Sequence, residues 1–149
     1  MDRQLKTFGA LTTEELYEIL RLRVDVFVVE QKCPYPELDG ADRDSLHLFA
    51  REGDAVTAYL RLCPKADEPG TVRLGRVVTA RRGAGLGGEL LRRGIGAAFD
   101  RMGAEEIYLE AQEYALGFYE REGFVPCSET FLEDGIPHRQ MRLKKSERK

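Results

Sequence analysis

The fold is decided by residues 72–99, which read VRLGRVVTARRGAGLGGELLRRGIGAAF. Apolar residues run to Thr79 in the manner of a strand, and glycines then cluster between positions 83 and 88. The residues that follow place Leu90, Leu91, Ile95 and Phe99 at helical spacing. The pattern predicts a strand, a glycine-rich loop and a helix in succession, as in α/β proteins.

The glycine-rich loop is a candidate pyrophosphate site. The first N–H groups of a helix have no partner inside the helix and carry partial positive charge. Gly83, Gly85 and Gly88 would let the backbone approach a phosphate with no Cβ in the way, and Arg81 and Arg82 could add charge-assisted contacts. The alternative is a tight turn whose glycines only relieve packing.

The same glycines match G-x-G-x-x-G, the fingerprint of dinucleotide-binding proteins. Three features argue against that ligand. Residues 79–82 separate the apolar strand from the first glycine, a single strand–helix–strand unit is visible, and predicted hairpins lie on both sides of it. A nicotinamide-dinucleotide binder is therefore the less favoured alternative. The sequence also lacks the G-x-x-x-x-G-K-[ST] motif of ATP-binding loops.

Helix and hairpin patterns surround this central unit. Thr12 and Glu15 form a capping box that predicts the start of a helix, and prolines at 34 and 36 predict its end. The other expected elements are a hairpin of strands 46–50 and 55–63, a strand at 107–109, a helix at 114–121, a hairpin of strands 124–132 and 136–143, and a charged tail at 144–149. The order predicts one α/β domain, residues 1–149, with a mixed, mostly antiparallel sheet flanked by helices.

Composition narrows the class of protein. The chain has 149 residues, 42% hydrophobic and 33% charged, with a net charge of −3, which fits one globular domain and no nucleic-acid partner. Its cysteines, Cys33, Cys63 and Cys127, are odd in number and far apart. This predicts reduced thiols in the cytoplasm and no metal site. We also expect no membrane association, because no apolar run has the length of a signal peptide or a membrane span.

Two motifs resemble the GNAT superfamily of N-acetyltransferases. Arg82-x-x-Gly85-x-Gly87 resembles its R/Q-x-x-G-x-G/A motif, and GFYEREGF at 117–124 resembles its F-Y-x-x-x-G-F segment. Further stretches resemble the ElaA-like branch, namely residues 26–31, 33–35, 38–40 and 133–138. The resemblance covers nearly the whole chain, from the first helix to the final strand.

The resemblance implies a sheet whose two central parallel strands splay apart, with acyl-CoA in the gap and acetyl-CoA as cosubstrate. It places the pantetheine arm along Val77, Val78 and Thr79. The pyrophosphate would be held by the backbone amides of Arg82, Gly83, Ala84, Gly85, Leu86, Gly87 and Gly88. Tyr119 would stand near the thioester sulfur. Many family members carry an asparagine after the splayed strand, where this chain offers Gln112 as a substitute.

Acyl transfer to an amine also needs a base. At pH 7 an aliphatic ammonium is neutral in only about one molecule in a few thousand, so a base or a desolvating pocket must remove its proton. Glu30, at the end of the first helix, is the first candidate, with a solvated helix-end carboxylate as the alternative. Glu110 on the splayed strand and His47 on the first hairpin are rivals, although a strand histidine is more often structural.

The remaining roles complete the expected mechanism. Tyr119 would give its proton to the departing thiolate, or else only pack in the core, and an amide near Val78 could hold the oxyanion. Gln31, Asp39 and His138 are expected to shape the acceptor pocket. Asp39 could instead cap its turn, and His138 could simply follow a proline on an edge strand.

The sequence therefore predicts an acetyl-CoA-dependent N-acetyltransferase without a metal. With no evident serine or cysteine nucleophile, transfer to a small-molecule or peptide amine is expected to be direct, in a ternary complex. The alternative is a CoA-binding regulatory or interaction module on the same fold, without turnover. The hairpin at 124–143 could support a homodimer. Acceptor identity and acyl-chain preference are left open.

Overall fold

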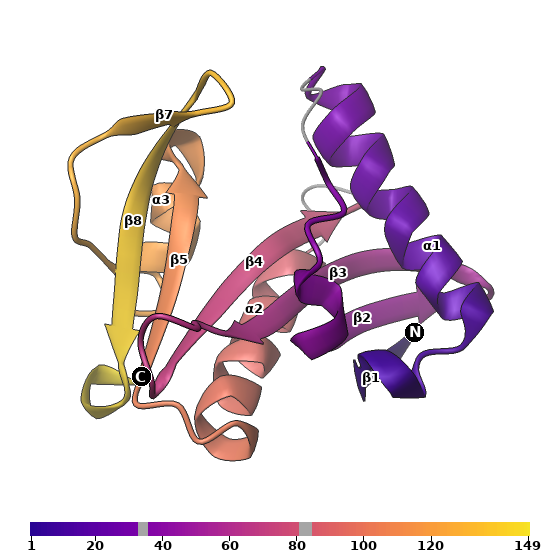
Figure 1. Ribbon diagram of the computed structural model, residues 1–149, viewed down its shortest axis with the longest axis horizontal. Helices are drawn as coiled ribbons and strands as arrows, with labels where there is room; N and C mark the ends of the chain where they lie inside the picture. The colour runs from indigo at the N-terminus through magenta and orange to yellow at the C-terminus, as the bar shows by residue number, and fades with distance from the viewer. Residues whose placement is uncertain (33–35, 81–84) are drawn as a thin grey trace.

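The computed structural model describes residues 1–32, 36–80 and 85–149. Their strands form one sheet of order β1-β2-β3-β4-β5-β8-β6, with β7 pairing with β8 (Figure 1). The strands are β1 Asp2–Thr7, β2 Leu46–Glu52, β3 Ala55–Pro64, β4 Thr71–Thr79, β5 Glu106–Gln112, β6 Val125–Pro126, β7 Phe131–Glu133 and β8 Ile136–Lys144. Only the β4–β5 pair is parallel among these pairings, which confirms the predicted mixed, mostly antiparallel sheet with helices on it.

The first helix begins where the sequence predicts. The capping box is confirmed, because the Glu15 amide donates to Thr12 Oγ1 at 3.0 Å and the Thr12 amide donates to the Glu15 carboxylate at 2.9 Å. The longer helices are α1 Thr13–Arg23, extended by the π-helical η2 Val24–Glu30, and α2 Leu86–Gly96, extended by η4 Ala97–Arg101. The shorter ones are η1 Phe8–Ala10, η3 Ala41–Asp44, η5 Glu113–Ala115, α3 Leu116–Glu120 and η6 Lys145–Glu147. None of the helices within the described ranges could traverse a bilayer.

Two apolar cores lie on opposite faces of the sheet, because successive strand residues point to opposite sides. On one face Phe49 and Tyr59 pack with Ile19 of α1. On the other face a larger core joins α2 to the sheet and includes Leu48, Ala50, Ala58, Leu60, Leu90, Leu91 and Ile95. Figure 1 shows α1 and α2 on the two sides accordingly. This arrangement places β3 and β4 between two helices.

Two features differ from the sequence prediction. The strand β1 was not expected, because Asp2–Thr7 contains a single aliphatic residue and forms a partly exposed edge beside β2. The strand expected at 124–132 is broken into β6 and β7. The Ser128 hydroxyl between them accepts from the Gln140 amide at 2.9 Å, which replaces a ladder hydrogen bond. The predicted Asp134-Gly135 hairpin is confirmed, with φ values of 50° and 77° that suit a type I′ turn.

Candidate active site

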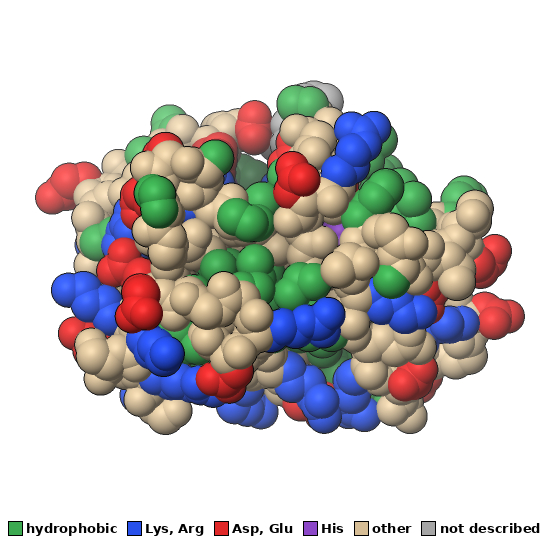
Figure 2. Space-filling model, turned by 60° about the horizontal axis from the view of Figure 1, so that its bottom comes forward, with side chains coloured by type: hydrophobic (Ala, Val, Ile, Leu, Met, Phe, Trp, Pro, Cys, Tyr) green, Lys and Arg blue, Asp and Glu red, His purple; other side chains and the backbone are tan. Residues whose placement is uncertain are grey.

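A cavity opens where β4 and β5 part. The two strands pair only through Thr71–Arg73 and Glu106–Tyr108, and each then continues without the other. Figure 1 shows the resulting wedge between the two halves of the sheet. Both strands, α2, α3, η2 and the β7–β8 turn line a cavity of about 1040 Å³. Figure 2 shows hydrophobic side chains gathered in the middle of one face, with charged side chains around them. This volume is at the upper end for a small-molecule site.

A β-bulge shapes the β4 wall of the cavity. Gly75 and Val78 lie opposite Arg61 and Tyr59 of β3, so Arg76 and Val77 share one partner position. Arg76 has a φ of 54°, in the left-handed region that non-glycine residues rarely adopt. A bulge takes one residue out of the ladder and often lies beside an active site. The structure thus places Val77, Val78 and Thr79 on the cavity wall.

The glycine-rich segment forms the narrow end of the cavity. Gly85 precedes the first turn of α2 with a φ of 76°, and Gly87 and Gly88 line the cavity. A Cβ at Gly87 would lie 3.4 Å from Thr79 Cγ2 and 3.7 Å from the Phe118 ring. The N-terminus of α2, where backbone N–H groups can bind a phosphate, thus borders the cavity. The side chain of Leu86 packs against the core. Arg82, Gly83 and Ala84 lie outside the described residues.

Two arginines at this end were not predicted as site residues. Arg92 and Arg121 both line the cavity. Arg92 could have been found from the sequence, because it follows Gly88 by four residues and so shares its helix face. Glu89 in the first turn would repel an anion, but Arg3 of β1 donates to its carboxylate at 2.8 Å. That hydrogen bond lowers the pKa of Glu89 below its usual value and balances its charge.

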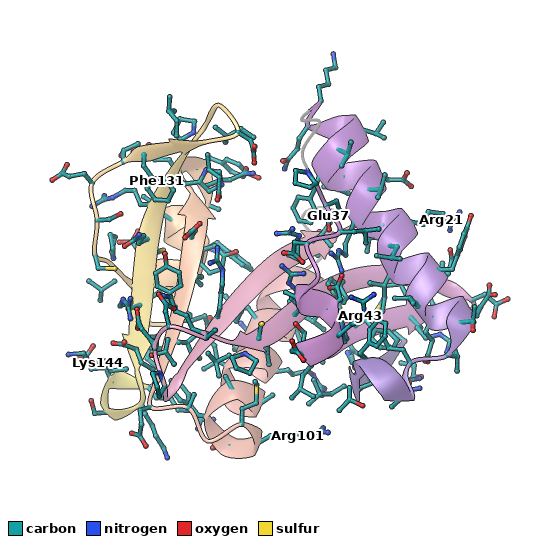
Figure 3. The ribbon with its side chains drawn as sticks, in the orientation of Figure 1. Arg21, Glu37, Arg43, Arg101, Phe131 and Lys144 are labelled. Atoms are coloured by element: carbon teal, nitrogen blue, oxygen red, sulfur yellow. The ribbon has the colours of Figure 1, made fainter. Side chains whose placement is uncertain are left out.

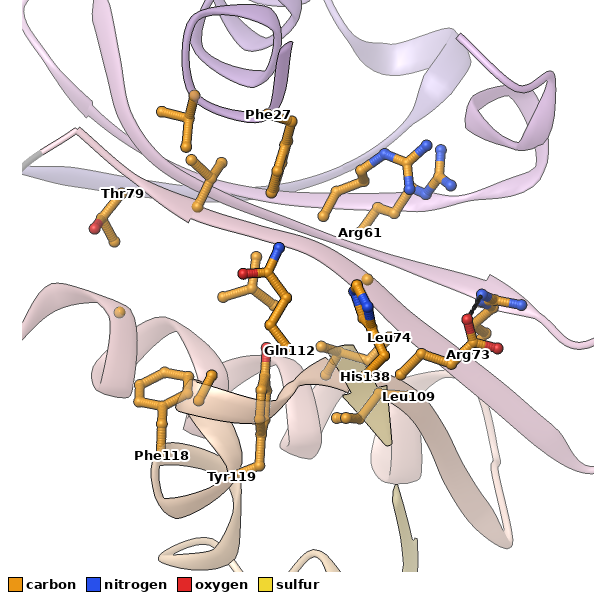
Figure 4. A pocket seen from close by; sticks show the side chains of 18 of the residues that line it. Phe27, Arg61, Arg73, Leu74, Thr79, Leu109, Gln112, Phe118, Tyr119 and His138 are labelled. Carbon is orange, nitrogen blue, oxygen red and sulfur yellow. Dashed lines mark ion pairs between the residues drawn. The ribbon is translucent and has the colours of Figure 1, made fainter. Parts of the chain in front are cut away.

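Tyr119 stands at the centre of the cavity wall. Its ring packs edge-on against Phe118 and Phe124, with centroids 5.0 and 6.0 Å apart, and its hydroxyl end points toward Gln112 (Figure 4). Burial raises the pKa of Tyr119 well above its usual value, so the hydroxyl keeps its proton at neutral pH. Gln112 donates to Gln31 Oε1 at 3.3 Å and so joins β5 to η2 across the cleft. Tyr119 is both a core aromatic and a cavity residue.

The acidic end of the cavity lies on the β5–β8 half of the sheet. Glu110 accepts from the Tyr108 hydroxyl at 2.6 Å and pairs with Arg73 at 3.1 Å. Glu133 lies beside it, and burial together with the Glu110 charge raises the pKa of Glu133. His138 is 8% exposed and points into the same cavity (Figure 4). The structure thus brings together Glu110 and His138, both predicted, with Glu133, which was not.

A buried ion-pair network stabilises the cavity wall that lies across from Glu110 and His138. Arg23 is fully buried and pairs with Glu37 and Asp42, and Arg61 pairs with Asp42 and Asp39. Figure 3 shows Glu37 pointing from its loop toward the strands. Burial acts to raise the pKa of Asp39, but the hydrogen bond from Arg61 outweighs it and holds that pKa far below its usual value. Asp39 lines the cavity as predicted, with its charge matched by arginine.

Two predicted residues are placed elsewhere. His47 is 1% exposed, with Nδ1 2.6 Å from the Tyr59 hydroxyl and Nε2 2.8 Å from the Asp42 carbonyl oxygen. Burial lowers the pKa of His47, so it is a neutral structural residue and not a contact for a substrate. Glu30 is exposed at the end of η2, and the lining residues of that segment are Val26, Phe27 and Gln31. The π-helical turn, in which Gln31 N donates to Val26 O, puts these three on one face and Glu30 off it.

The described part of the chain offers no set of metal ligands. Within the described ranges, no group of three or more His, Cys, Asp or Glu side chains could hold a metal ion. The cavity instead offers a helix N-terminus with arginines at one end, a backbone bulge and a buried tyrosine in the middle, and carboxylates with an imidazole at the other end. These groups suit a long anionic ligand that carries its reactive group toward a polar pocket.

Known proteins share both the sequence and this architecture. A family model described as "Acetyltransferase (GNAT) domain" matches residues 11–145. A UPF0039 protein of Schizosaccharomyces pombe is 43% identical over 142 residues, which are 93% of this chain and 93% of the relative. The crystal structure of an acyl-CoA N-acyltransferase from Pseudomonas aeruginosa is 45% identical, with a TM-score of 0.88 over 95% of this chain and 99% of the other.

A further relative identifies the branch. Protein ElaA of Escherichia coli is 38% identical over 132 residues, which are 86% of each chain. Its crystal structure superimposes with a TM-score of 0.89 and 35% identity, over 95% of this chain and 97% of ElaA. The parted strands, the glycine end and these relatives agree, and the chain therefore belongs to the GNAT acetyltransferase family, in its ElaA-like branch.

Proposed function

We propose that this chain transfers an acetyl group from acetyl-CoA to a primary amine by direct attack in a ternary complex. The observation that carries the proposal is the parting of β4 and β5 beside the β4 bulge. This opening is continuous from the N-terminus of α2 to the pocket of Glu110 and His138. A cosubstrate with phosphates at one end and a thioester at the other fits such a path.

The binding roles follow from the two ends of the cavity. Backbone N–H groups at the start of α2 would hold the pyrophosphate, and Gly87 leaves the space that a Cβ would take. Arg92 and Arg121 would add charge-assisted contacts. The pantetheine arm would run along Val77 and Val78, which line the cavity at the bulge.

The middle of the cavity supplies the chemistry of transfer. An amide released from the ladder at the bulge would stabilise negative charge on the thioester oxygen as the amine attacks. The Tyr119 hydroxyl keeps its proton at neutral pH and would supply a hydrogen to the departing sulfur. A short acyl group is favoured because the hydrogen bond between Gln31 and Gln112 crosses the cleft near this point.

The test is release of free CoA thiol from acetyl-CoA in the presence of a panel of small and peptide amines. We expect release that requires an amine and yields the N-acetylated product by mass spectrometry. Binding of CoA without release with any amine would favour the alternative, a CoA-binding module without turnover. A thermal shift with a nicotinamide dinucleotide and none with CoA would contradict the cosubstrate assignment itself.

A further inference from the structure

His138 is a buried imidazole that faces the cavity. It lies on β8 opposite Gln112 of β5 in the antiparallel register, so the two side chains share one face of the sheet. Phe131 of β7 stacks on its ring, with centroids 6.0 Å apart and planes 28° apart. Figure 4 shows the ring pointing into the cavity beside Gln112, toward which the hydroxyl end of Tyr119 also points. One face of the imidazole packs against Phe131, and another part of the ring borders the cavity. This packing fixes the orientation in which the imidazole can contact a ligand.

The hydrogen bond of one ring nitrogen determines what the other offers. Nδ1 of His138 lies 2.7 Å from the carbonyl oxygen of Ile136. A carbonyl oxygen can only accept, so Nδ1 carries the proton of the neutral ring and Nε2 holds a lone pair. Oε2 of Glu133 lies 3.7 Å from Nε2, which is beyond hydrogen-bond distance. Among the described residues, this imidazole acceptor has no hydrogen-bond partner, and it faces the cavity on a side chain that is nine-tenths buried.

The charges around this nitrogen favour a cation. The groups near it are Glu133 of β7, Glu110 of β5 and Asp134 in the turn, together with Arg73 of β4, which pairs with Glu110. On the facing wall, Asp39 is matched by Arg61 and Arg76. Burial and Glu110 together raise the pKa of Glu133, because two close carboxylates repel. An ammonium group between the two carboxylates would relieve that repulsion.

We propose that Nε2 of His138 is the general base of the reaction, and that the acceptor is a protonated aliphatic amine held beside Glu110 and Glu133. This inference rests on the proposed acetyl transfer and names its base and acceptor class. Imidazole suits the role because it can take a proton and return it to solvent near neutral pH. Once protonated, it faces the Glu133 carboxylate, which stabilises the imidazolium.

The protons balance over one turnover. The ammonium gives its first proton to Nε2 of His138, and the freed nitrogen lone pair forms the bond to the thioester carbonyl carbon. As the carbon–sulfur bond breaks, the sulfur takes the Tyr119 proton. The second proton of the attacking nitrogen returns to the Tyr119 oxygen. His138 then releases its proton to solvent, so the products are the amide, the CoA thiol and one proton.

The test compares pH profiles of kcat/KM for an aliphatic amine in the wild type and in His138→Asn. The asparagine amide can still donate to the Ile136 carbonyl, but nothing replaces Nε2. We expect kcat/KM at pH 7 to fall by about 100- to 10,000-fold, with the dissociation constant of acetyl-CoA unchanged.

The wild-type profile should be flat above neutrality. That of the variant should rise about tenfold per pH unit toward the amine pKa near 10, because only the free amine can then react. Added imidazole should restore part of the rate.

Two further variants separate this role from a structural one. His47→Asn removes the other histidine, which faces no ligand, and should keep the flat wild-type profile. Glu133→Gln should keep the flat profile as well, because the proposed base, Nε2 of His138, is still present. This second readout does not depend on the folding of His138→Asn.

Opposite results would overturn the proposal. If His138→Asn keeps the flat profile and a rate within twofold of the wild type, His138 is not the base. If Glu133→Gln acquires the tenfold slope instead, Glu133 is the base. Absence of wild-type turnover with every amine would contradict the proposed acetyl transfer itself. This failure can be told apart from failure of the base assignment, because it is seen in the wild type before any variant is compared.

Discussion

Replacing Arg23 by methionine tests whether the buried ion-pair network stabilises the cavity wall that carries Asp39. Arg23 is fully buried on α1 and its guanidinium contacts the Glu37 carboxylate, the Asp42 carboxylate at 2.8 Å and the Glu37 carbonyl oxygen at 3.2 Å. It also lies over the Tyr59 ring, 5.5 Å from its centroid. Methionine keeps most of the aliphatic volume, so the change removes chiefly the charge and its hydrogen bonds.

The expected loss of stability follows from what remains. Removing one partner of a buried ion pair typically costs about 3–5 kcal/mol. Here Glu37 keeps Arg76 and Asp42 keeps Arg61, so the two carboxylates are not left without a cation. We therefore expect a loss of stability at the lower end of that range, about 3 kcal/mol. For a chain of this size, this loss corresponds to a fall of roughly 10 °C in melting temperature.

The assay is thermal unfolding of Arg23→Met beside Arg21→Met, a matched control on the same helix. Arg21 is 56% exposed and pairs only with Glu18 among the ion pairs of the described residues, so its loss should change stability by less than about 0.5 kcal/mol. Because the network also positions Asp39, the KM for the amine should rise in Arg23→Met while acetyl-CoA affinity stays near the wild-type value. Equal melting temperatures for the two variants would refute the reasoning.

Three further outcomes are expected. Burial acts to raise the pKa of Asp42, but Arg23 outweighs it and lowers that pKa. This carboxylate therefore stabilises the fold above its unfolded pKa of about 3.9, and the stabilisation is lost as the pH falls through the lower folded value. Urea unfolding between pH 6 and pH 2 should show the decline, and Asp42→Asn should reduce it. A Cβ at Gly94 would lie 3.1 Å from Leu60, so Gly94→Val should cost about 1–3 kcal/mol in denaturant titrations. Gly96→Ala, a control with only ordinary contacts at 3.5 Å, should not destabilise. Tyr119→Phe should lower kcat about 100-fold without changing acetyl-CoA affinity, and unchanged turnover in stopped thiol assays would remove its role as the acid.

Much of the site could be placed from short motifs because each motif is local. Glycines before a helix predict an anion site at its N-terminus, and the structure puts Gly85, Gly87 and Gly88 there beside the cavity. The F-Y-x-x-x-G-F segment at 117–124 predicted Tyr119 on a helix, and the structure places Tyr119 there, on the wall of the same cavity. In both cases the chemistry lies within a few residues of the signal.

Residues that act across the sheet were harder to assign. Glu30 was a reasonable base from its place at a helix end, but the π-helical turn of η2 rotates it off the cavity face. His47 and His138 are both strand histidines, and nothing in the local sequence says which faces ligand. Their environments differ because His47 on β2 is covered by the loop at 36–44, while His138 on β8 lies opposite Gln112 of β5 and lines the cavity.

The sequence by itself determined the order of the elements from the first helix to the last strand, apart from the break between β6 and β7, together with the capped first helix and the Asp134-Gly135 hairpin, because each depends on contacts between near neighbours. It also carried the family, through motifs spread along the whole chain. Only the tertiary structure decided where β4 and β5 stop pairing, that β1 joins the edge of the sheet, and that Glu110, Glu133 and His138 share one pocket. Those facts depend on strand register and on packing between residues far apart in the chain, which no local pattern encodes.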